Sequence, residues 1–270
     1  ERARIGAEMP IDITLPTDRL RTRSRFEDAS KTLEGFDVND DGSRVALSSR
    51  GEIWTIPVKG GRTVALNETP AFRERQPSYS PDGKHIAAIT DETGEQEIVI
   101  FDAMGKEQRR ILTKGGQGWV FEPAWSPDGK SLAYSDLTQT LYILDVESGK
   151  RTVVDDDNAW EVSEYTFSPD GKWLAYTKPF GAWTWDSSIY LYNMEDGKSY
   201  PATTRFTGDH SPAWDPEGKY LYFVSSRSFN PMLCSRDFEF ITMKTDVPCA
   251  IVLASDGVPP FVSDEIAKLY

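Results

Sequence analysis

The sequence predicts an all-β protein, a β-propeller of four-stranded antiparallel blades, on the strength of three observations. The pentapeptide SPDGK occurs at 80–84, 126–130 and 168–172, and the related turns NDDGS and DPEGK surround Gly42 and Gly218. An alternating apolar run follows each of these five turns, whereas helical periodicity is almost absent. A repeat of about 40–45 residues that contains four short strands is the signature of a propeller blade.

Each repeat contains candidate strands that are rich in β-branched and aromatic residues. The strand before the turn is expected at 77–80, 123–126, 164–168 and 212–215. The strand after the turn is expected at 45–49, 86–90, 132–136, 174–178 and 221–225. A third strand is expected at 52–58, 97–103, 140–146, 188–194 and 250–256. A shorter fourth strand is expected at 62–67, 109–114, 151–156 and 199–204.

The SPDGK turn has the composition of a tight hairpin connection. Pro81 presets φ to about −65° at the first corner, Asp82 favours the second corner, and Gly83 accepts the left-handed conformation at the exit. The repeated residues therefore indicate repeated hairpins, each fixing the register of two antiparallel strands. Asp82, Asp128 and Asp170 also suggest calcium ligands, but no EF-hand-like ligand series surrounds them. We interpret them as turn carboxylates that accept hydrogen bonds from backbone N–H groups.

The repeats also predict how the chain is organised. We expect five blades, at 31–71, 72–117, 118–159, 160–206 and 207–258. Residues 1–30 would form a partial blade or a strand that closes the ring, and residues 259–270, which begin with two prolines, would form a linker toward a further domain. Insertions at 178–188 and 226–249 interrupt the last two blades and are long enough to suggest function.

Two groups of residues are candidate contacts for a peptide or a protein partner. A basic stripe in an otherwise acidic chain is formed by Arg19, Arg21, Arg23 and Arg25. This stripe either binds an acidic partner or forms a solvated strand face that pairs with local carboxylates. The first insertion carries Trp183 and Trp185, which either pack on a neighbouring blade or line a ligand surface.

Composition limits the classes of partner. The formal net charge is −13, so the surface repels phosphate, which argues against nucleic acids and anionic membranes as partners. No apolar run approaches about 20 residues, so no membrane span is expected. Cys234 and Cys249 lack the spacing of a zinc site. They are either two reduced thiols or, in an oxidising compartment, a local disulfide.

The sequence contains no recognisable catalytic centre. It has no GxSxG elbow, no HExxH pair and no phosphate-binding loop. The two histidines, His85 and His210, are not accompanied by a nucleophile motif. We therefore expect no catalytic residue, no cofactor and no metal site in this chain.

The repeats resemble the WD40-like propeller repeats that are shared by TolB, dipeptidyl-peptidase-type propellers and tricorn-type proteases. Three stretches are similar to the tricorn-type pattern: RGEIWTIPVKGG through SPDGK at 50–84, SSIYLY through PATT at 187–204, and DHSPAWDPEGKYLYFVSSRSFNP through DFEFI at 209–241. The resemblance covers nearly the whole chain, and its last stretch is the most specific.

This resemblance implies a large serine peptidase whose catalytic core lies beyond the propellers, so no catalytic residue can be carried over to this chain. It implies a ring of seven blades, of which five are visible here. Such a ring would guide unfolded peptides toward an enclosed active site, or products away from it. The resemblance also implies a homo-oligomer of the full-length protein, located in the cytoplasm, with export to the periplasm as the alternative.

A second hypothesis belongs to a different functional class. The chain would then be a free-standing TolB-like propeller that serves as a scaffold for protein–protein contacts, with no peptidase attached. A weaker third hypothesis is the propeller of a prolyl-oligopeptidase-type enzyme, which requires an α/β-hydrolase domain with a GxSxG motif. The reading frame downstream of Tyr270 distinguishes these hypotheses.

Overall fold

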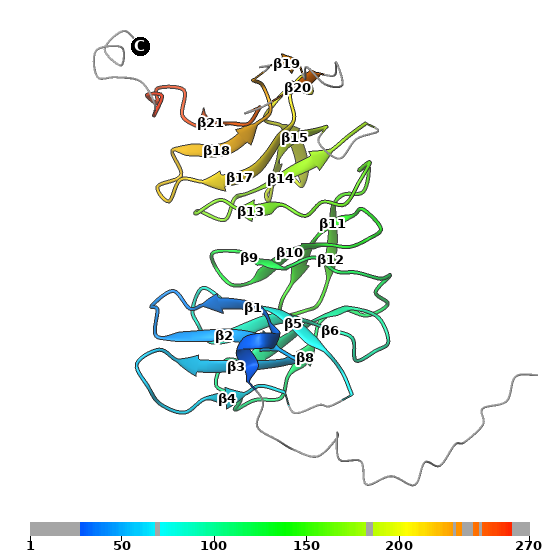
Figure 1. Cartoon of the computed structure of the whole chain (residues 1–270), viewed down its shortest axis with the longest axis vertical. Coiled ribbons are helices and arrows are strands. Elements are labelled where there is room, and N and C mark those ends of the chain that lie inside the picture. Colours follow the sequence, from blue (N-terminus) through cyan, green and yellow to red (C-terminus); the bar gives the residue numbers. More distant parts are fainter. Residues whose placement is uncertain are drawn as a thin grey trace, which may run out of the picture.

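The structure, a computed structural model, describes residues 28–67, 71–181, 186–228, 231–233, 240–242 and 245–260. Within these residues the chain forms β-strands joined by turns, with one short 3-10 helix at Ala29–Thr32. The strands build successive antiparallel sheets that fan out as blades (Figure 1). This arrangement confirms the predicted all-β propeller.

Four of the sheets contain four strands, which are arranged in chain order across the sheet. The first contains β1 (Leu33–Val38), β2 (Arg44–Ser49), β3 (Glu52–Pro57) and β4 (Val64–Ala65). The second contains β5 (Glu74–Tyr79), β6 (His85–Thr90), β7 (Glu97–Asp102) and β8 (Arg110–Ile111). The third contains β9 (Ala124–Trp125), β10 (Ser131–Ser135), β11 (Leu141–Asp145) and β12 (Arg151–Asp155). The fourth contains β13 (Tyr165–Phe167), β14 (Trp173–Pro179), β15 (Ser187–Asn193) and β16 (Lys198–Pro201).

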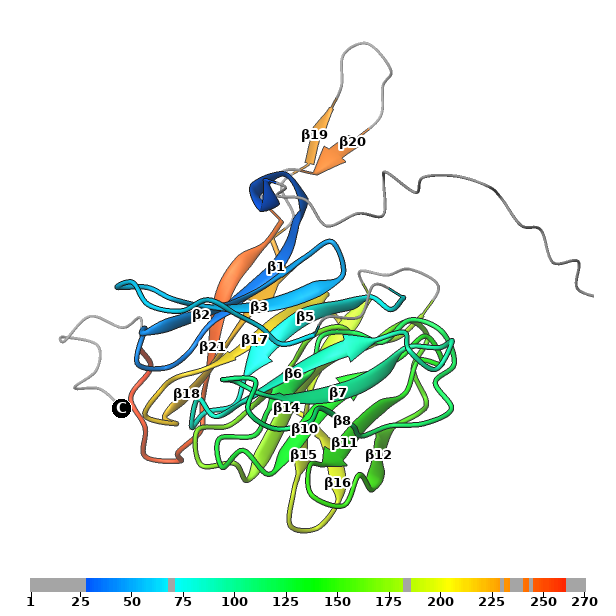
Figure 2. The ribbon, with the colours of Figure 1, turned by 90° about the horizontal axis from the view of Figure 1, so that it is seen from below.

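The fifth sheet has three strands within the described residues: β17 (Asp209–Trp214), β18 (Tyr220–Ser225) and β21 (Val247–Val252). Between β18 and β21, the strands β19 (Pro231–Leu233) and β20 (Phe240–Thr242) pair as a ribbon that extends away from the blades (Figure 2). The sequence indicated only a long loop in this insertion, because strands of three residues are too short to give a clear alternation.

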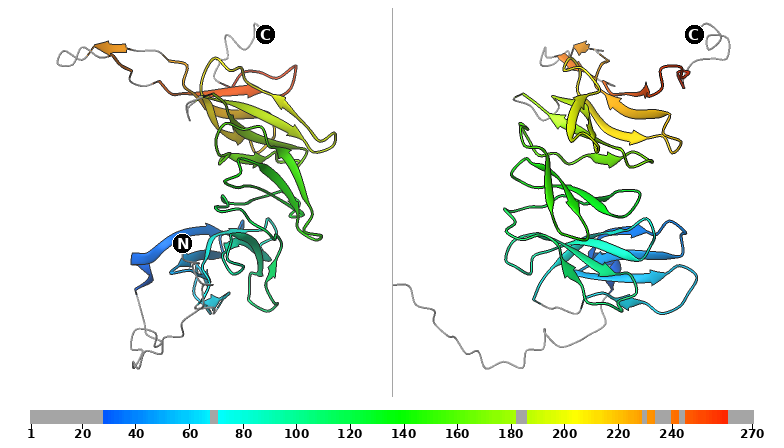
Figure 3. Two further views of the ribbon diagram at one scale, coloured as in Figure 1. Left: turned by 90° about the vertical axis from the view of Figure 1, so that its right-hand side faces the viewer. Right: turned by 180° about the vertical axis from the view of Figure 1, so that it is seen from behind.

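The blades form a curved arc, with the first and fifth blades at its two ends (Figure 3). The strand that precedes each repeated turn lies on the concave side of the arc. An open cavity of about 580 Å³ on this side is lined by residues from β5, β9, β13 and β17 or from the segments just before them. The innermost strands of successive blades therefore share one concave surface.

The second and third strands of the interior blades are covered on both faces. In β6, Ile86 and Ala88 lie in the core shared with the first blade, while Ala87 and Ile89 lie in the core shared with the third. Successive side chains of a strand point to opposite faces of the sheet, so all four are buried. The apolar run after each turn reflects this two-sided burial.

The repeated turns adopt the conformation that their composition predicts. The glycines of the three SPDGK copies have φ values of 69° or 70°. In the second copy, Asp128 Oδ1 accepts hydrogen bonds from Ser126 Oγ (2.7 Å) and Lys130 N (3.1 Å), and Gly129 N donates to Ser126 O (2.9 Å). The first and third copies make the same set of bonds. All three aspartates are thus turn carboxylates.

Hydrogen bonds also join neighbouring blades at their innermost strands. The indole of Trp125 donates to Ser78 O (3.0 Å), and the indole of Trp214 donates to Thr166 O (3.0 Å). Both tryptophans are half-buried, and an indole N–H withdrawn from water without a partner would cost free energy. These two bonds tie the third blade to the second and the fifth blade to the fourth.

The fourth strands of the first two blades are shorter than the sequence indicates. β4 and β8 contain only two residues each, because side chains take over the ladder. Asn67 Oδ1 accepts a hydrogen bond from Ile53 N (2.7 Å), and Thr113 Oγ1 accepts one from Ile98 N (2.8 Å). Apolar alternation alone cannot reveal where a polar side chain replaces a backbone acceptor.

An ion pair links the first strand of the second blade to the residue that precedes its last strand. Glu74 is fully buried, and its Oε1 lies 2.8 Å from Arg109 Nη1, while Arg109 Nη2 lies 2.8 Å from Glu92 Oε2. Asn67 and Thr90 also donate to the Glu74 carboxylate. Burial raises the pKa of Glu74, and the Arg109 guanidinium opposes this effect.

We predict that Asp128→Ala lowers the free energy of unfolding by about 1 kcal/mol at neutral pH, because Ser126 Oγ and Lys130 N lose their acceptor. The Ser126 hydroxyl holds the pKa of Asp128 below its ordinary value of 3.8. Its contribution is therefore present above pH 3.8 and lost as the pH falls through the folded-state pKa. Urea unfolding at neutral and acidic pH measures the difference, with Asp156→Ala in an exposed loop as the control. Equal losses for the two variants would contradict the prediction.

We predict that Arg109→Ala costs about 3 kcal/mol at neutral pH, because it leaves the buried Glu74 carboxylate without its cation. Burial already raises the pKa of Glu74 above 4.5, and loss of the Arg109 cation removes the effect that opposes this rise. The folded state of the variant therefore binds a proton more readily than the unfolded chain does. This proton contributes stability at low pH, and the contribution is lost as the pH rises through the folded-state pKa. The loss should therefore be smaller at pH 4.5 than at pH 7 in urea unfolding. The double variant Glu74→Gln/Arg109→Ala should recover most of the stability. No recovery would show that the charge is not the cause.

Candidate functional site: the concave face

The concave face presents one equivalent position from every blade. This position lies three residues before the last residue of the innermost strand, and it is occupied by Gly35, Gln76, Glu122, Glu164 and Ser211. The 580 Å³ cavity is lined by Glu122, Glu164 and Ser211 together with their neighbours. A second open cavity, of about 390 Å³, lies beside the first two blades and includes Gly35, Gln76 and again Glu122. The two cavities share Glu122 in their linings and together make up the candidate site.

The backbone along this face is shaped so that it resists pairing with another strand. Gln76 and Ser211 have positive φ values of 52° and 55°, and the ladders shift register at both positions. The next residue in each case, Pro77 or Pro212, carries no N–H group, and Pro123 stands at the equivalent place in the third blade. Bulges and prolines blunt the edge of a sheet. A bound chain would therefore be recognised by side chains and shape.

The face is acidic. The described residues that line its two cavities include no lysine or arginine. Glu34 is paired with Arg73 at 3.0 Å, whereas Glu122 makes no ion pair among the described residues. The concave surroundings desolvate Glu122 and raise its pKa, and the nearby Asp37 carboxylate raises it further. Such a surface attracts cationic ligands and repels anionic ones.

A serine, a histidine and a glutamate meet on this face, but they do not form a nucleophilic triad. Ser211 Oγ donates its only proton to Glu164 Oε1 (3.0 Å), and Ser211 N donates to Glu164 Oε2 (2.7 Å). His210 Nδ1 lies 2.9 Å from Ser211 Oγ, so the imidazole must donate this hydrogen bond. In a catalytic triad the histidine accepts the serine proton, and in this arrangement His210 donates to the serine instead. The cluster ties the fifth blade to the fourth.

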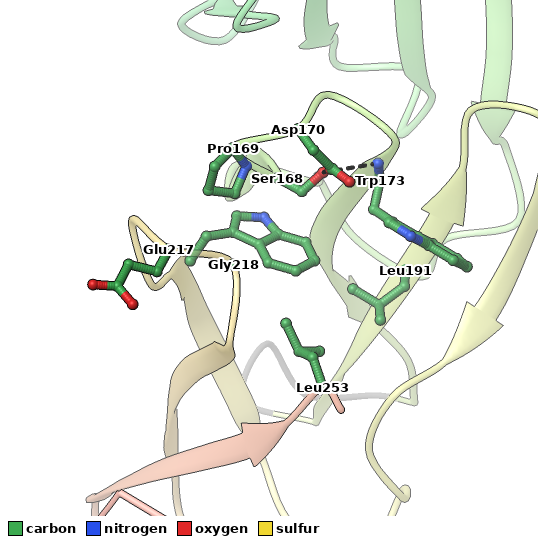
Figure 4. A pocket seen from close by; sticks show the side chains of 9 residues that line it. Ser168, Pro169, Asp170, Trp173, Leu191, Glu217, Gly218 and Leu253 are labelled. Carbon is green, nitrogen blue, oxygen red and sulfur yellow. Dashed lines mark hydrogen bonds between the residues drawn. The ribbon is translucent and has the colours of Figure 1, made fainter. Parts of the chain in front are cut away.

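A cleft of about 390 Å³ lies between the fourth and fifth blades at the repeated turns (Figure 4). A Cβ on Gly129 or Gly171 would lie 3.8 Å from a proline of the preceding turn, whereas a Cβ on Gly218 would meet nothing within 4 Å. The fifth turn thus stands away from the fourth, and side chains such as Trp173 and Leu253 line the gap. Its carboxylates are paired with lysines of their own turns, so it offers no free catalytic group.

Several residues that the sequence singled out cannot be placed. The candidate contacts Arg19, Arg21, Arg23, Arg25, Trp183 and Trp185 lie outside the described residues, as does Cys234. Cys249 is a free thiol on β21 that packs in the core between the fourth and fifth blades. Among the described residues no group of three or more histidine, cysteine, aspartate or glutamate side chains is placed to hold a metal ion. No helix in the described part of the chain is long and apolar enough to cross a membrane.

The sequence analysis missed the glutamates of the concave face, although a signal was present. The dipeptides Gln76–Pro77, Glu122–Pro123 and Ser211–Pro212 occur at the same distance before three of the repeated turns. Aligning the repeats backward from the turn would have identified this position.

Comparison with known proteins decides the family. A family model described as "Tricorn protease second beta propeller domain" matches residues 33–268. The chain belongs to this family. It is 29% identical over 245 residues to a protein named tricorn protease homolog from Saccharolobus solfataricus, and the match covers 91% of this chain and 22% of that relative. The chain therefore spans about a quarter or less of the tricorn-type proteins that it matches.

Solved structures agree with this membership of the tricorn family. The crystal structure of the tricorn protease superposes with a TM-score of 0.76 at 26% identity, covering 88% of this chain and 24% of that protein. A putative TolB from Agrobacterium tumefaciens superposes with a TM-score of 0.56 at 24% identity, covering 74% of this chain and 73% of that one. The second likeness supports the propeller fold alone.

We predict that Ser211 does not react with a fluorophosphonate probe, which labels activated serines. The hydroxyl donates to the Glu164 carboxylate, which is a much weaker base than imidazole, and it accepts from His210, so the histidine does not activate it. Mass spectrometry of the treated chain should find the peptide containing Ser211 unmodified, with a serine peptidase labelled in the same tube as the positive control. Labelling of Ser211 that is lost in His210→Ala would contradict this prediction.

Proposed function

We propose that this chain is the non-catalytic propeller portion of a tricorn-like serine peptidase and that it guides peptides to or from a proteolytic core outside the chain. One observation carries the proposal. A tricorn propeller model matches 33–268, while the chain corresponds to less than a quarter of the tricorn protease homolog. The rest of such a protein has ample length for a peptidase core.

The concave face supplies a physical basis for guiding peptides. Its acidic side chains favour basic or neutral chains over acidic ones, and the net charge of −13 extends this preference to the whole surface. The bulges and prolines at its strand edges prevent a peptide from pairing with them as an additional β-strand. Such pairing would bind the peptide through a row of backbone hydrogen bonds and slow its release. A surface that guides peptides of different sequences should bind each of them weakly, and these features of the concave face meet that requirement.

We further propose that the domain boundaries expected from the repeats apply to the whole protein. The outward face of the first sheet supports a longer ring, because Phe36 is 66% exposed and pairs across the sheet with Leu47, and Val38 is 43% exposed and pairs with Val45. Each interior blade covers such a face with a neighbour. A preceding blade would cover it here, with residues 1–30 supplying a partial blade or ring-closing strand and 259–270 a linker.

The assembly and location of the whole protein are also proposals. We propose that the full-length protein forms a homo-oligomer in the cytoplasm, as the tricorn resemblance implies, with a periplasmic or exported protein as the alternative. Peptides or unfolded polypeptides would be its partners. The free-standing TolB-like scaffold remains a second candidate, because the chain covers 73% of the putative TolB structure, a near-complete domain match at the level of fold.

The decisive experiment uses the polypeptide encoded by the complete gene. We predict that Glu122→Lys lowers kcat/KM severalfold for a lysine-rich peptide of about 20 residues, which spans about 65 Å when extended. Hydrolysis of a short chromogenic amide should be unchanged, because a small substrate needs no guidance. The matched control is Glu147→Lys, which makes the same charge change in the exposed turn between β11 and β12.

Two results would overturn the proposal. Equal effects of Glu122→Lys and Glu147→Lys on the long peptide would mean that the concave face guides nothing. A reading frame without a peptidase core beyond Tyr270 would favour the scaffold function instead.

A further inference from the structure

A separate cavity of about 380 Å³ opens beside the concave face and has the chemistry of a cation site. It shares Ser163 and Glu164 with the concave cavity, so the two spaces adjoin. Its apolar walls include Phe121 from the third blade and Trp160 and Pro179 from the fourth. A side chain that branches from a peptide on the concave face is of suitable size to enter it.

The loop that carries Trp160 is held in place before any ligand binds. Asn158 Nδ2 donates to Gln139 O (2.8 Å), and Ala159 N donates to Pro179 O (3.3 Å). On the other side of the tryptophan, the Ser135 hydroxyl donates to Val162 O, and the Val162 side chain is fully buried. These hydrogen bonds on both sides of the loop fix the backbone at Trp160 and Glu161, so ligand binding would cost little conformational entropy of the loop.

The charges around the cavity are of one sign. Its described lining includes no lysine or arginine, but it includes Glu161 and Glu164. Glu161 is exposed and makes no ion pair among the described residues. Glu164 is oriented by hydrogen bonds from Thr177 Oγ1 (2.7 Å) and from Ser211 N (2.7 Å) and Oγ (3.0 Å). Glu161 is therefore free of an ion pair among the described residues, and Glu164 Oε1, which accepts only the Ser211 hydroxyl, can accept a further hydrogen bond.

These features exclude other occupants. An apolar side chain would desolvate the two carboxylates without pairing them, and a phosphate or carboxylate ligand would be repelled. A metal ion would need more ligating groups than the described residues bring together here. A guanidinium or ammonium group would offer donors to the carboxylates and a positive charge to the face of Trp160, which is 37% exposed.

We propose that this cavity binds the side chain of a lysine or arginine in an extended peptide that lies along the concave face. The inference rests on the proposed peptide-guiding function and adds a side-chain preference to it. The preference would arise in the propeller, away from the chemistry of peptide cleavage.

The test measures peptide binding to the full 270-residue chain by fluorescence anisotropy. The probes are two blocked, extended peptides of serine, alanine and glycine that differ only in a central arginine or glutamine. We predict that the arginine peptide binds about tenfold more tightly, the increment expected for a cation that meets an aromatic face and a carboxylate. Trp160→Ala and Glu161→Gln should each remove most of this difference.

Control variants separate the pocket from general effects. Trp160→Phe should retain most of the arginine preference, because it keeps an aromatic face, and Glu147→Gln should retain all of it. Circular dichroism establishes that each variant is folded. A preference that survives both Trp160→Ala and Glu161→Gln would overturn the pocket and assign the effect to overall charge.

Two further outcomes distinguish the proposed side-chain pocket from the proposed peptide-guiding function on which it rests. Equal binding of the arginine and glutamine peptides would overturn the pocket while leaving the concave face as a peptide surface. Binding of neither peptide would overturn both proposals.

Discussion

The structure depends on one constraint, which is that each blade is apolar on both faces and must be covered on both. A four-stranded sheet of this size buries too little by itself to be stable. In β6, alternate side chains supply the cores toward the first and the third blades, so each blade stabilises two neighbours. Stability therefore accumulates around the arc, and among the described residues Phe36 lies exposed on the outer face of the first blade.

The same constraint creates the concave face. Blades that pack side by side converge on one axis, and the edge of every innermost strand is left there without a sheet partner. An unprotected edge would pair with any extended chain. Bulges at Gln76 and Ser211 and prolines at equivalent positions prevent this, while Glu122 and Glu164 make the surface acidic. The acidic and strand-resistant character of the face follows from protecting these edges with bulges, prolines and polar groups.

Tertiary hydrogen bonds then decide what the polar residues can do. Glu164 and Ser211 lie far apart in sequence, yet the glutamate accepts the serine proton and holds the fourth and fifth blades together. The same glutamate borders the cavity next to Trp160. The same glutamate thus serves the packing of blades and the cation recognition that we propose, and its bond to the Ser211 hydroxyl keeps that serine from donating to His210.

The sequence by itself determined the fold class, the turns and the central strands, because these depend on local composition. Proline, aspartate and glycine specify the turn wherever it occurs, and two-sided burial leaves an apolar run that needs no partner to be recognised. Only the tertiary structure decided the length of β4, the pairing of β19 with β20, and the meeting of Glu164 with Ser211 and of Trp160 with Phe121. Each of these features depends on contacts between residues that are distant in sequence, and the local pattern of a single repeat does not specify such contacts.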